Sequence, residues 1–370
     1  MKMETFSVLL VLAAYTMVTS SISVACVNKG WYYDIPEEDV CIIKDVQLPT
    51  AAGDHLQFDY GNGSADTMAA LHISLKSNDS SNVTIPTEVF EILPKLQIFS
   101  IEYVNAILPS TFRNASNLKI LILALSRFSE INEHTFDGLD KLESLNLQWD
   151  KNVTRTISGK DFSIPSLQSL RLRRSQLLSI GDDPFDLPKL IDFDLSDNNL
   201  TSLSDLVFSK LPNLQELMLN NNKLVHIGDS LRNLPNIKTI GLHFNSITDI
   251  DLHKFAELPH LETLNLWSSG FSFPLSEKPT ILRNRSLKTL NLSSNNLKYA
   301  CDLGQLRIFE GITTLDLSSN QYENFVYGIS HLKTILPNLR MLRLSNNKID
   351  CTNCDEVEKQ FKKQNVTRYS

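Results

Sequence analysis

Histidine and cysteine are the side chains of this sequence best suited to catalysis or metal binding, and their spacing favours neither. The eight histidines are scattered along the chain without the paired spacing of a metal motif. The sequence has no Gly-x-Ser-x-Gly motif and no phosphate-binding glycine loop. Cys351 and Cys354 have the spacing of a zinc or redox pair, but suitably spaced further ligands and a thioredoxin-like context are missing. We predict a protein that is not an enzyme and uses no cofactor and no metal.

The asparagines point instead to the secretory pathway. Asn-x-Ser/Thr sequons accept N-linked glycans in that compartment. A single sequon arises easily by chance, whereas nine in one chain indicate secretory passage, although some come from an Asn-rich repeat. The predicted glycosylation sites are Asn62, Asn78, Asn82, Asn114, Asn152, Asn199, Asn284, Asn291 and Asn365.

The N-terminal segment, residues 1–25, has the pattern of a signal peptide. Lys2 precedes an apolar run from Phe6 to Val18, and small residues lead to a cleavage site before Cys26. The run is shorter than the roughly 20 residues that a helix needs to span a bilayer, so a retained anchor is the weaker alternative. No second run approaches that length, and we expect a secreted, extracellular protein without a membrane span.

The element that must position any binding residue is a repeat. The pattern L-x-x-L-x-L-x-x-N-x-L is the leucine-rich-repeat signature. Its clearest copies start at Leu190, Leu214, Leu287 and Leu339, and consecutive starts are 22 to 27 residues apart. Further copies start at Leu96, Leu118, Leu142, Leu167, Ile237, Leu261 and Ile312, and a degenerate copy precedes them from Ala70 to Leu93. The copies from Leu142 and Leu261 are irregular, with Asp150 and Ser269 in place of the asparagine.

Each copy should contribute one short strand whose leucines point into a core, because side chains alternate along a strand. The asparagine at position nine can satisfy backbone groups where the chain turns. One copy cannot bury its apolar face alone, so the copies must stack. We predict an α/β-type solenoid: a leucine-rich-repeat horseshoe with a parallel concave sheet, about 11–12 repeats and a mostly irregular, short-helical convex side.

The two ends of the solenoid need covers. We predict an N-terminal cysteine cap at 26–69 with a Cys26–Cys41 disulfide, the solenoid at 70–350, and a short C-terminal cap or tail at 351–370 containing an amphipathic helix. Five cysteines cannot all pair within one chain. Either Cys301 stays buried as a free thiol, or Cys351 or Cys354 forms an intermolecular disulfide.

The residues between the strand leucines should face outward on the concave side and form the partner-binding surface. Exposed apolar and aromatic side chains near arginines are typical of interface hot spots, although such residues also pack on one another. The predicted footprint is Ile98, Ile120, Ile122, Trp149, Arg171, Arg173, Met218, His243, Phe244 and Trp267. Asn291, a sequon, lies in the middle column. The net charge of -7 argues against a nucleic-acid partner.

The leader, the repeat type and the caps resemble extracellular leucine-rich-repeat proteins, including Toll-type receptor ectodomains. The phrase INEHTFDGLDKLESLNL is similar to insect members, and the short N-terminal cysteine region with the Cys351-x-x-Cys354 exit resembles mosquito leucine-rich immune molecules. That resemblance implies secretion, disulfide-linked assembly and immune defence through complement-like factors. Longer members of the group continue into a coiled coil. This sequence has no heptads after its repeats, so it resembles a coil-less type.

These patterns favour a secreted innate-immune recognition or adaptor protein that binds protein or microbial-surface partners through the concave face. Its partners would include complement-like factors, or a second repeat protein joined by a disulfide. The alternatives are an extracellular matrix, adhesion or receptor-ectodomain-like ligand-binding protein, and an enzyme inhibitor.

Overall fold

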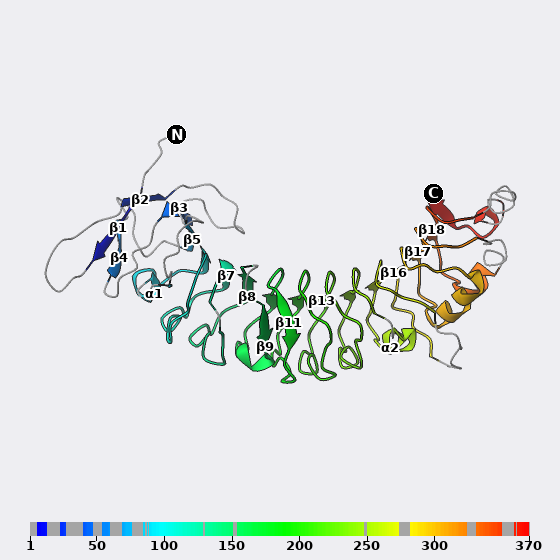
Figure 1. Ribbon diagram of the computed structural model, residues 1–370, viewed down its shortest axis with the longest axis horizontal. Helices are drawn as coiled ribbons and strands as arrows, with labels where there is room; N and C mark the ends of the chain where they lie inside the picture. Colours follow the sequence, from blue (N-terminus) through cyan, green and yellow to red (C-terminus); the bar gives the residue numbers. More distant parts are fainter. Residues whose placement is uncertain are drawn as a thin grey trace. The chain divides into compact units, whose positions relative to one another are not determined.

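The computed structural model describes residues 6–12, 23–26, 40–46, 54–59, 69–75, 84–85, 87, 89–128, 130–150, 154–247, 250–273, 282–323, 331–349, 359 and 361–369. Side chains are described from residue 69 on, except those of 74–75, 300–301 and 368–369. The chain divides into two compact units. The first comprises Met1–Gln176 and Asp186–Leu190, and the second comprises Leu177–Phe185 and Ile191–Ser370. Figure 1 shows the elements of each unit in chain order.

The first unit contains a parallel sheet. Its strands are β3 (Val40–Val46), β5 (Ala70–Leu75), β6 (Ile98–Glu102), β7 (Ile120–Ser126), β8 (Ser144–Trp149) and β10 (Ser169–Arg171), hydrogen-bonded in that order. A separate antiparallel sheet joins β1 (Phe6–Leu12) to β2 (Ser23–Cys26) and β4 (Asp54–Asp59). The remaining elements are α1 (Val89–Ile92), β9 (Arg155–Ile157) and the 3-10 helix η2 (Gly159–Asp161).

The second unit contains a parallel sheet with one strand per repeat. Its strands, in hydrogen-bonded order, are β12 (Asp192–Asp194), β13 (Glu216–Met218), β14 (Thr239–Gly241), β15 (Thr263–Asn265), β16 (Thr289–Asn291), β17 (Thr314–Asp316), β18 (Met341–Arg343) and β19 (Thr367–Tyr369). The connections carry α2 (Leu252–Ala256), η3 (Ala300–Ile308) and α4 (Leu332–Ile335), and β11 (Leu177–Ile180) precedes the sheet.

The register of these strands keeps the repeat in phase. Leu217 pairs with Ile240, which pairs with Leu264, and all three are fully buried. Phe208 and Leu211, from the second half of a copy, are also fully buried. The predicted leucine-rich-repeat solenoid with a parallel sheet is therefore confirmed.

A ladder of asparagines at position nine ties six of the eleven copies to the copy before them. The Oδ1 atom of Asn222 accepts from the backbone N–H of Leu200 at 3.0 Å. Its Nδ2 donates to the carbonyls of Leu195 and Leu219, each at 3.0 Å. Asn245 and Asn320 repeat the arrangement. A buried polar backbone group is costly unless it is paired, so the asparagine lets the chain turn inside the core.

A left-handed residue directly precedes the ladder position in ten of the eleven copies. Asn221, Phe244 and Asn346 are examples, with φ of 54°, 55° and 54°. This conformation turns the chain away from the strand, and asparagine tolerates it better than most residues. The exception is the irregular copy from Leu142, where Trp149 stays within β8.

Both predicted caps add a strand to the solenoid. In the first unit β3 pairs in parallel with β5, and in the second unit β19 pairs in parallel with β18. Residues 361–363 are helical and Phe361 is buried, whereas Val357 lies outside the described residues. Cleavage of the predicted leader would remove β1 and leave β4 without its partner in the antiparallel sheet.

Candidate binding surface

The face of each parallel sheet opposite its leucine core carries positions three, five and seven of every copy, and we call it the open sheet face. In the second unit it holds a cluster of Met218, His243, Phe244 and Trp267, which we call the aromatic patch. The Phe244 and Trp267 rings lie 4.4 Å apart between centroids, and His243 stacks on Trp267 at 6.1 Å with 15° between the ring planes. Phe244 is 40% exposed and Trp267 is 37% exposed. The four residues predicted for this part of the footprint therefore lie together.

A glycine shapes the floor of the patch. Gly241 pairs with Met218 across neighbouring strands. A Cβ at Gly241 would lie only 2.7 Å from the Met218 sulfur and 3.8 Å from Cε1 of His243. The missing side chain thus gives the thioether and the imidazole their space. The sequence did not single out Gly241, although its position between two strand leucines places it on the same face.

Burial shapes the chemistry of His243. Its Nδ1 atom is buried and has no hydrogen-bond partner among the described residues. Burial lowers the pKa of His243, and the charge of Asp197 opposes this effect in part. Desolvation penalises the charged imidazolium, so the ring is neutral near pH 7 and acts as an aromatic surface.

Local bonds hold the other two rings. Trp267 Nε1 donates to Ser294 Oγ at 3.1 Å, and the Trp267 backbone N–H donates to Asn265 Oδ1 at 3.1 Å. Phe244 occupies the left-handed position with φ of 55°. The same conformation recurs at this position in ten of the eleven copies, so it belongs to the repeat and not to the patch alone.

The predicted residues of the first unit give a mixed result. Arg171 and Arg173 are exposed, and Ile120 and Ile122 are half-buried on the open sheet face. Ile98 is only 4% exposed, so its inclusion in the footprint was wrong. Both faces of β6 are covered at that point of the chain.

Trp149 is a second correction. It is 2% exposed, and its ring packs edge-on against Phe128 at 5.5 Å. The Arg155 guanidinium lies over the indole at 5.2 Å from its centroid, and Arg155 Nη1 donates to the Phe128 carbonyl. Burial also lowers the pKa of Arg155. Trp149 is a core residue of the irregular copy, because its strand continues where other copies make the left-handed turn.

One predicted glycosylation site is incompatible with the folded chain. Asn284 is 4% exposed, and its Nδ2 donates to the Ala256 and Leu258 carbonyls at 3.3 Å and 3.0 Å. A glycan on that nitrogen would break both bonds. Asn114 and Asn365 are exposed, while Asn199 and Asn291 are half-buried. The sequons at Asn62, Asn78, Asn82 and Asn152, and the side chains of Cys26, Cys41, Cys301, Cys351 and Cys354, lie outside the described residues.

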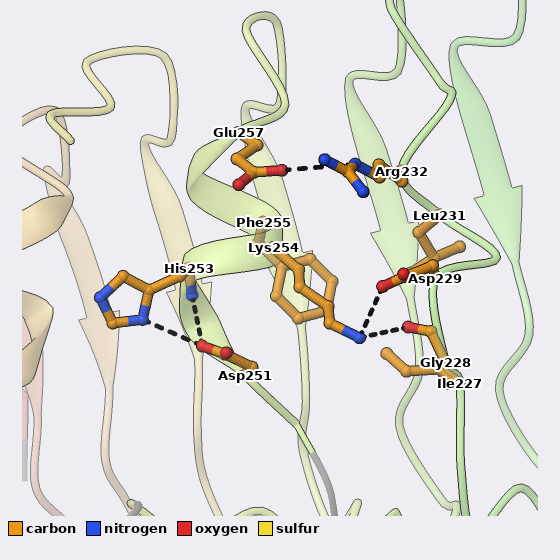
Figure 2. Close-up of a pocket in the computed structure, with 10 residues that line it drawn as sticks. All are labelled: Ile227, Gly228, Asp229, Leu231, Arg232, Asp251, His253, Lys254, Phe255 and Glu257. Atoms are coloured by element: carbon orange, nitrogen blue, oxygen red, sulfur yellow. Dashed lines mark hydrogen bonds and ion pairs between the residues drawn. The ribbon is translucent and has the colours of Figure 1, made fainter. Parts of the chain in front are cut away.

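A hollow of about 350 Å³ lies in the connections that follow β13 and β14 (Figure 2). Lys254 Nζ contacts the Asp229 carboxylate at 2.9 Å and the Gly228 carbonyl at 2.7 Å. The Lys254 ammonium lowers the pKa of Asp229. Because Asp251 also pairs with His253 at 2.9 Å, the charged groups of this hollow largely satisfy one another.

Other kinds of site find no support among the described residues. They contain no group of three or more His, Cys, Asp or Glu side chains placed to hold a metal ion. No helix in the same part of the chain is long and apolar enough to cross a membrane.

The stacked copies and the asparagine ladder define the class of this protein, a leucine-rich-repeat solenoid. The family model described as "Leucine rich repeat" matches residues 99–151, 165–224 and 212–269. Toll-like receptor 3 of Bos taurus is 34% identical over 141 residues, which cover 36% of this chain and 16% of the receptor. The CD180 antigen of Mus musculus is 32% identical over 146 residues, which cover 37% of this chain and 22% of that protein. The chain therefore resembles Toll-type ectodomains and spans about a fifth of the length of these relatives.

Solved structures share the fold. The mouse RP105/MD-1 complex superposes with a TM-score of 0.63 at 21% identity, covering 90% of this chain and 50% of that one. An internalin, InlF of Listeria monocytogenes, gives 0.60 at 19% identity, covering 96% and 90%. The TLR13–ssRNA13 complex gives 0.51 at 22% identity, covering 80% and 53%.

Proposed function

We propose that this chain is a secreted innate-immune recognition or adaptor protein that binds a protein or microbial-surface partner through the aromatic patch. The observation that carries the proposal is the group of three mutually packed rings on the open sheet face. Two of these rings stay about two-fifths exposed and are not needed to fill the leucine core. Clustered aromatic side chains that keep contact with water are the usual anchors of interface hot spots.

The relatives support an immune setting. Toll-like receptor 3 and the CD180 antigen are similar over the repeat region. Among the proteins with the same fold, RP105 is in a complex with MD-1 and TLR13 with single-stranded RNA. For this chain the net charge of -7 favours a partner other than nucleic acid. The N-terminal cysteine region and the Cys351-x-x-Cys354 motif resemble those of mosquito leucine-rich immune molecules, which is a sequence-based argument for secretion and complement-like partners.

A receptor-ectodomain-like ligand-binding role is the second candidate, and the two immune-receptor relatives favour it. The two candidate functions differ in whether the chain is released from the cell or stays on its surface. Recovery of the cleaved, glycosylated chain from the medium of cells that express it would support the secreted form. Its retention on the cell surface would favour the receptor-like role.

The repeat offers matched variants to test the patch. Asn221 and Asn346 occupy the position equivalent to Phe244, and Ser293 and Ser318 occupy that of Trp267. The double variant Phe244→Asn/Trp267→Ser therefore keeps side chains that the fold already uses. Each truncation should weaken partner binding by about 30-fold or more, since a hot-spot residue contributes about 2 kcal/mol or more.

The experiment compares wild type and double variant for retention on intact Gram-negative bacteria, Gram-positive bacteria and yeast. It also compares the proteins that each cross-links in extracellular fluid. Loss of a ligand by the double variant, with an unchanged circular dichroism spectrum, supports the proposal. Equal retention of every ligand by both chains would overturn it.

A further inference from the structure

Beside the aromatic patch lies a stretch of the open sheet face without ionised side chains. It consists of positions three and five on β14, β15 and β16, and we call it the neutral window. Thr239, Thr263 and Thr289 form its first row, in register across the three strands. Gly241 and two asparagines form the second row. The flanking copies, in contrast, carry Glu216 on β13 and an Asp316–Arg343 ion pair on β17 and β18.

The asparagines of the window are fixed with their donors unused. Asn265 Oδ1 accepts from the Trp267 backbone N–H at 3.1 Å, and Asn291 Oδ1 accepts from Ser293 N and Oγ at 3.0 Å and 2.7 Å. These bonds hold each side chain in one orientation. The two Nδ2 groups donate to no acceptor within the described residues, and the hydroxyls of Thr263 and Thr289 likewise have no partner there.

The window and the neighbouring Trp267 therefore combine a partly exposed indole with a fixed, uncharged set of donors and acceptors. An anion would meet no cation in the window and would lie near Glu216. A purely apolar surface would leave the two amide donors and the hydroxyls unpaired, which is unfavourable. A saccharide matches both features of this surface, because its hydroxyls pair with the amides and its C–H faces pack on the aromatic ring. Neutral, pre-oriented groups also lose little solvation energy on binding.

We propose that the neutral window, together with Trp267, binds a neutral saccharide of a microbial surface when Asn291 carries no glycan. This inference deepens the proposed function and rests on it. Trp267 supplies the stacking face, while Asn265 and Asn291 supply amide donors on the two strands beside it. The spacing of adjacent strands, about 4.8 Å, places these donors at regular intervals along the ligand.

Asn291 is also a predicted glycosylation site, and a glycan on its Nδ2 would occupy the same window. The variant Ser293→Ala removes the sequon and keeps the amide. Its lost hydroxyl donates only to Asn291 Oδ1, which still accepts from the Ser293 backbone N–H. All binding measurements are therefore made on the Ser293→Ala chain, which presents the window without its own glycan.

The first measurement is tryptophan fluorescence during titration with yeast mannan, laminarin and dextran, with heparin as the charged control. Among the described tryptophans Trp267 is the exposed reporter, since Trp149 is buried, and Trp31 lies outside the described residues. We expect saturable binding of at least one neutral polysaccharide and none of heparin. Absence of binding to all three neutral probes, or equal binding of heparin, would overturn the inference.

A conservative variant tests the donor role. Asp316 occupies the position equivalent to Asn265 and accepts from the Ser318 backbone N–H in the same way, at 2.9 Å. Asn265→Asp thus keeps the local bond and replaces the amide donor by a carboxylate oxygen. We expect its affinity for the polysaccharide to fall at least tenfold, while Thr314→Ser, outside the window, keeps the original affinity. Unchanged affinity of Asn265→Asp would contradict the inference.

Whole cells separate this inference from the proposed function. Periodate cleaves the vicinal diols of surface sugars, whereas protease treatment removes surface proteins. Loss of binding after periodate alone supports the saccharide ligand. Loss after protease alone overturns the saccharide ligand and leaves the proposed function standing with a protein partner.

Discussion

At the scale of the residue, the asparagines of the ladder pair several buried backbone groups at once. Asn222 satisfies one N–H group and two carbonyls, which belong to two successive copies. Removing the amide leaves these three backbone groups without their partner at a buried position. The cost of an unsatisfied buried group is about 1–3 kcal/mol, and part of it is relieved by entry of water.

We expect Asn222→Ala to lower the free energy of unfolding by about 3 kcal/mol, because several buried backbone groups lose their bonds together. Urea denaturation followed by circular dichroism measures this change. Lys223→Ala, at the exposed neighbouring position, is the control and should change stability by less than about 0.5 kcal/mol. If the two variants have the same stability, the ladder does not have the role assigned to it.

His243 gives the patch a dependence on pH. Its pKa is lowered in the folded chain, so the unfolded chain takes up the proton first as pH falls below the ordinary value of about 6.5. The contribution of His243 to folding stability is therefore fully present above that pH and decreases as the pH falls below it. We expect the fall in Tm between pH 7 and pH 5 to be smaller in His243→Asn than in wild type.

Asn220 occupies the equivalent position one copy earlier, so asparagine is compatible with the site. His260→Asn, which changes an exposed histidine away from the patch, is the matched control. Differential scanning calorimetry across the pH range measures the effect. Parallel Tm curves for wild type and His243→Asn would show that burial of this imidazole has no influence on stability.

At the scale of the element, neighbouring copies approach closely at the turn that contains Gly311. A Cβ at Gly311 would overlap the carbonyl oxygen of Arg285 and lie 2.9 Å from that of Leu287. Backbone atoms cannot move aside as a flexible side chain can. Gly311→Ala should therefore destabilise the chain by about 1–3 kcal/mol, the usual cost of overpacking.

Lys189 occupies the same position in its own copy, directly before the first leucine, and is exposed. Lys189→Ala is thus the control for Gly311→Ala and should be nearly neutral. The urea midpoints of the two variants provide the comparison. A Gly311→Ala chain as stable as wild type would mean that the turn of this copy can move away from Arg285.

The sequence predicted the strands, the leucine core and the asparagine ladder because each depends on a short period that any copy reveals. The sequence-based prediction failed for residues whose surroundings differ from those of the equivalent position in other copies. Trp149 was assigned to the surface, since its strand was not expected to continue beyond the usual turn. Ile98 was assigned there too, although both faces of β6 are covered. The burial of Asn284 depends on carbonyls 26 and 28 residues away, which a local motif cannot reveal.

At the scale of the whole molecule, a solenoid transmits change only to neighbouring copies, because each copy contacts little else. The aromatic patch and the neutral window involve the three consecutive copies of β14, β15 and β16, with Met218 from the copy before them. Substitutions there should leave the copies of the first unit undisturbed. This independence allows surface residues to vary between copies while the leucines and asparagines keep the stack in register.

The cysteines determine whether the chain forms disulfide-linked assemblies. An odd number of cysteines leaves at least one thiol without an intramolecular partner. We expect the secreted chain to migrate as a disulfide-linked dimer, or as an adduct with a second repeat protein, in non-reducing electrophoresis and as a monomer after reduction. Cys351→Ser/Cys354→Ser should abolish the larger species, and Cys301→Ser is the control that should retain it. A monomer under both conditions in wild type, or a dimer that persists without Cys351 and Cys354, would contradict this assignment.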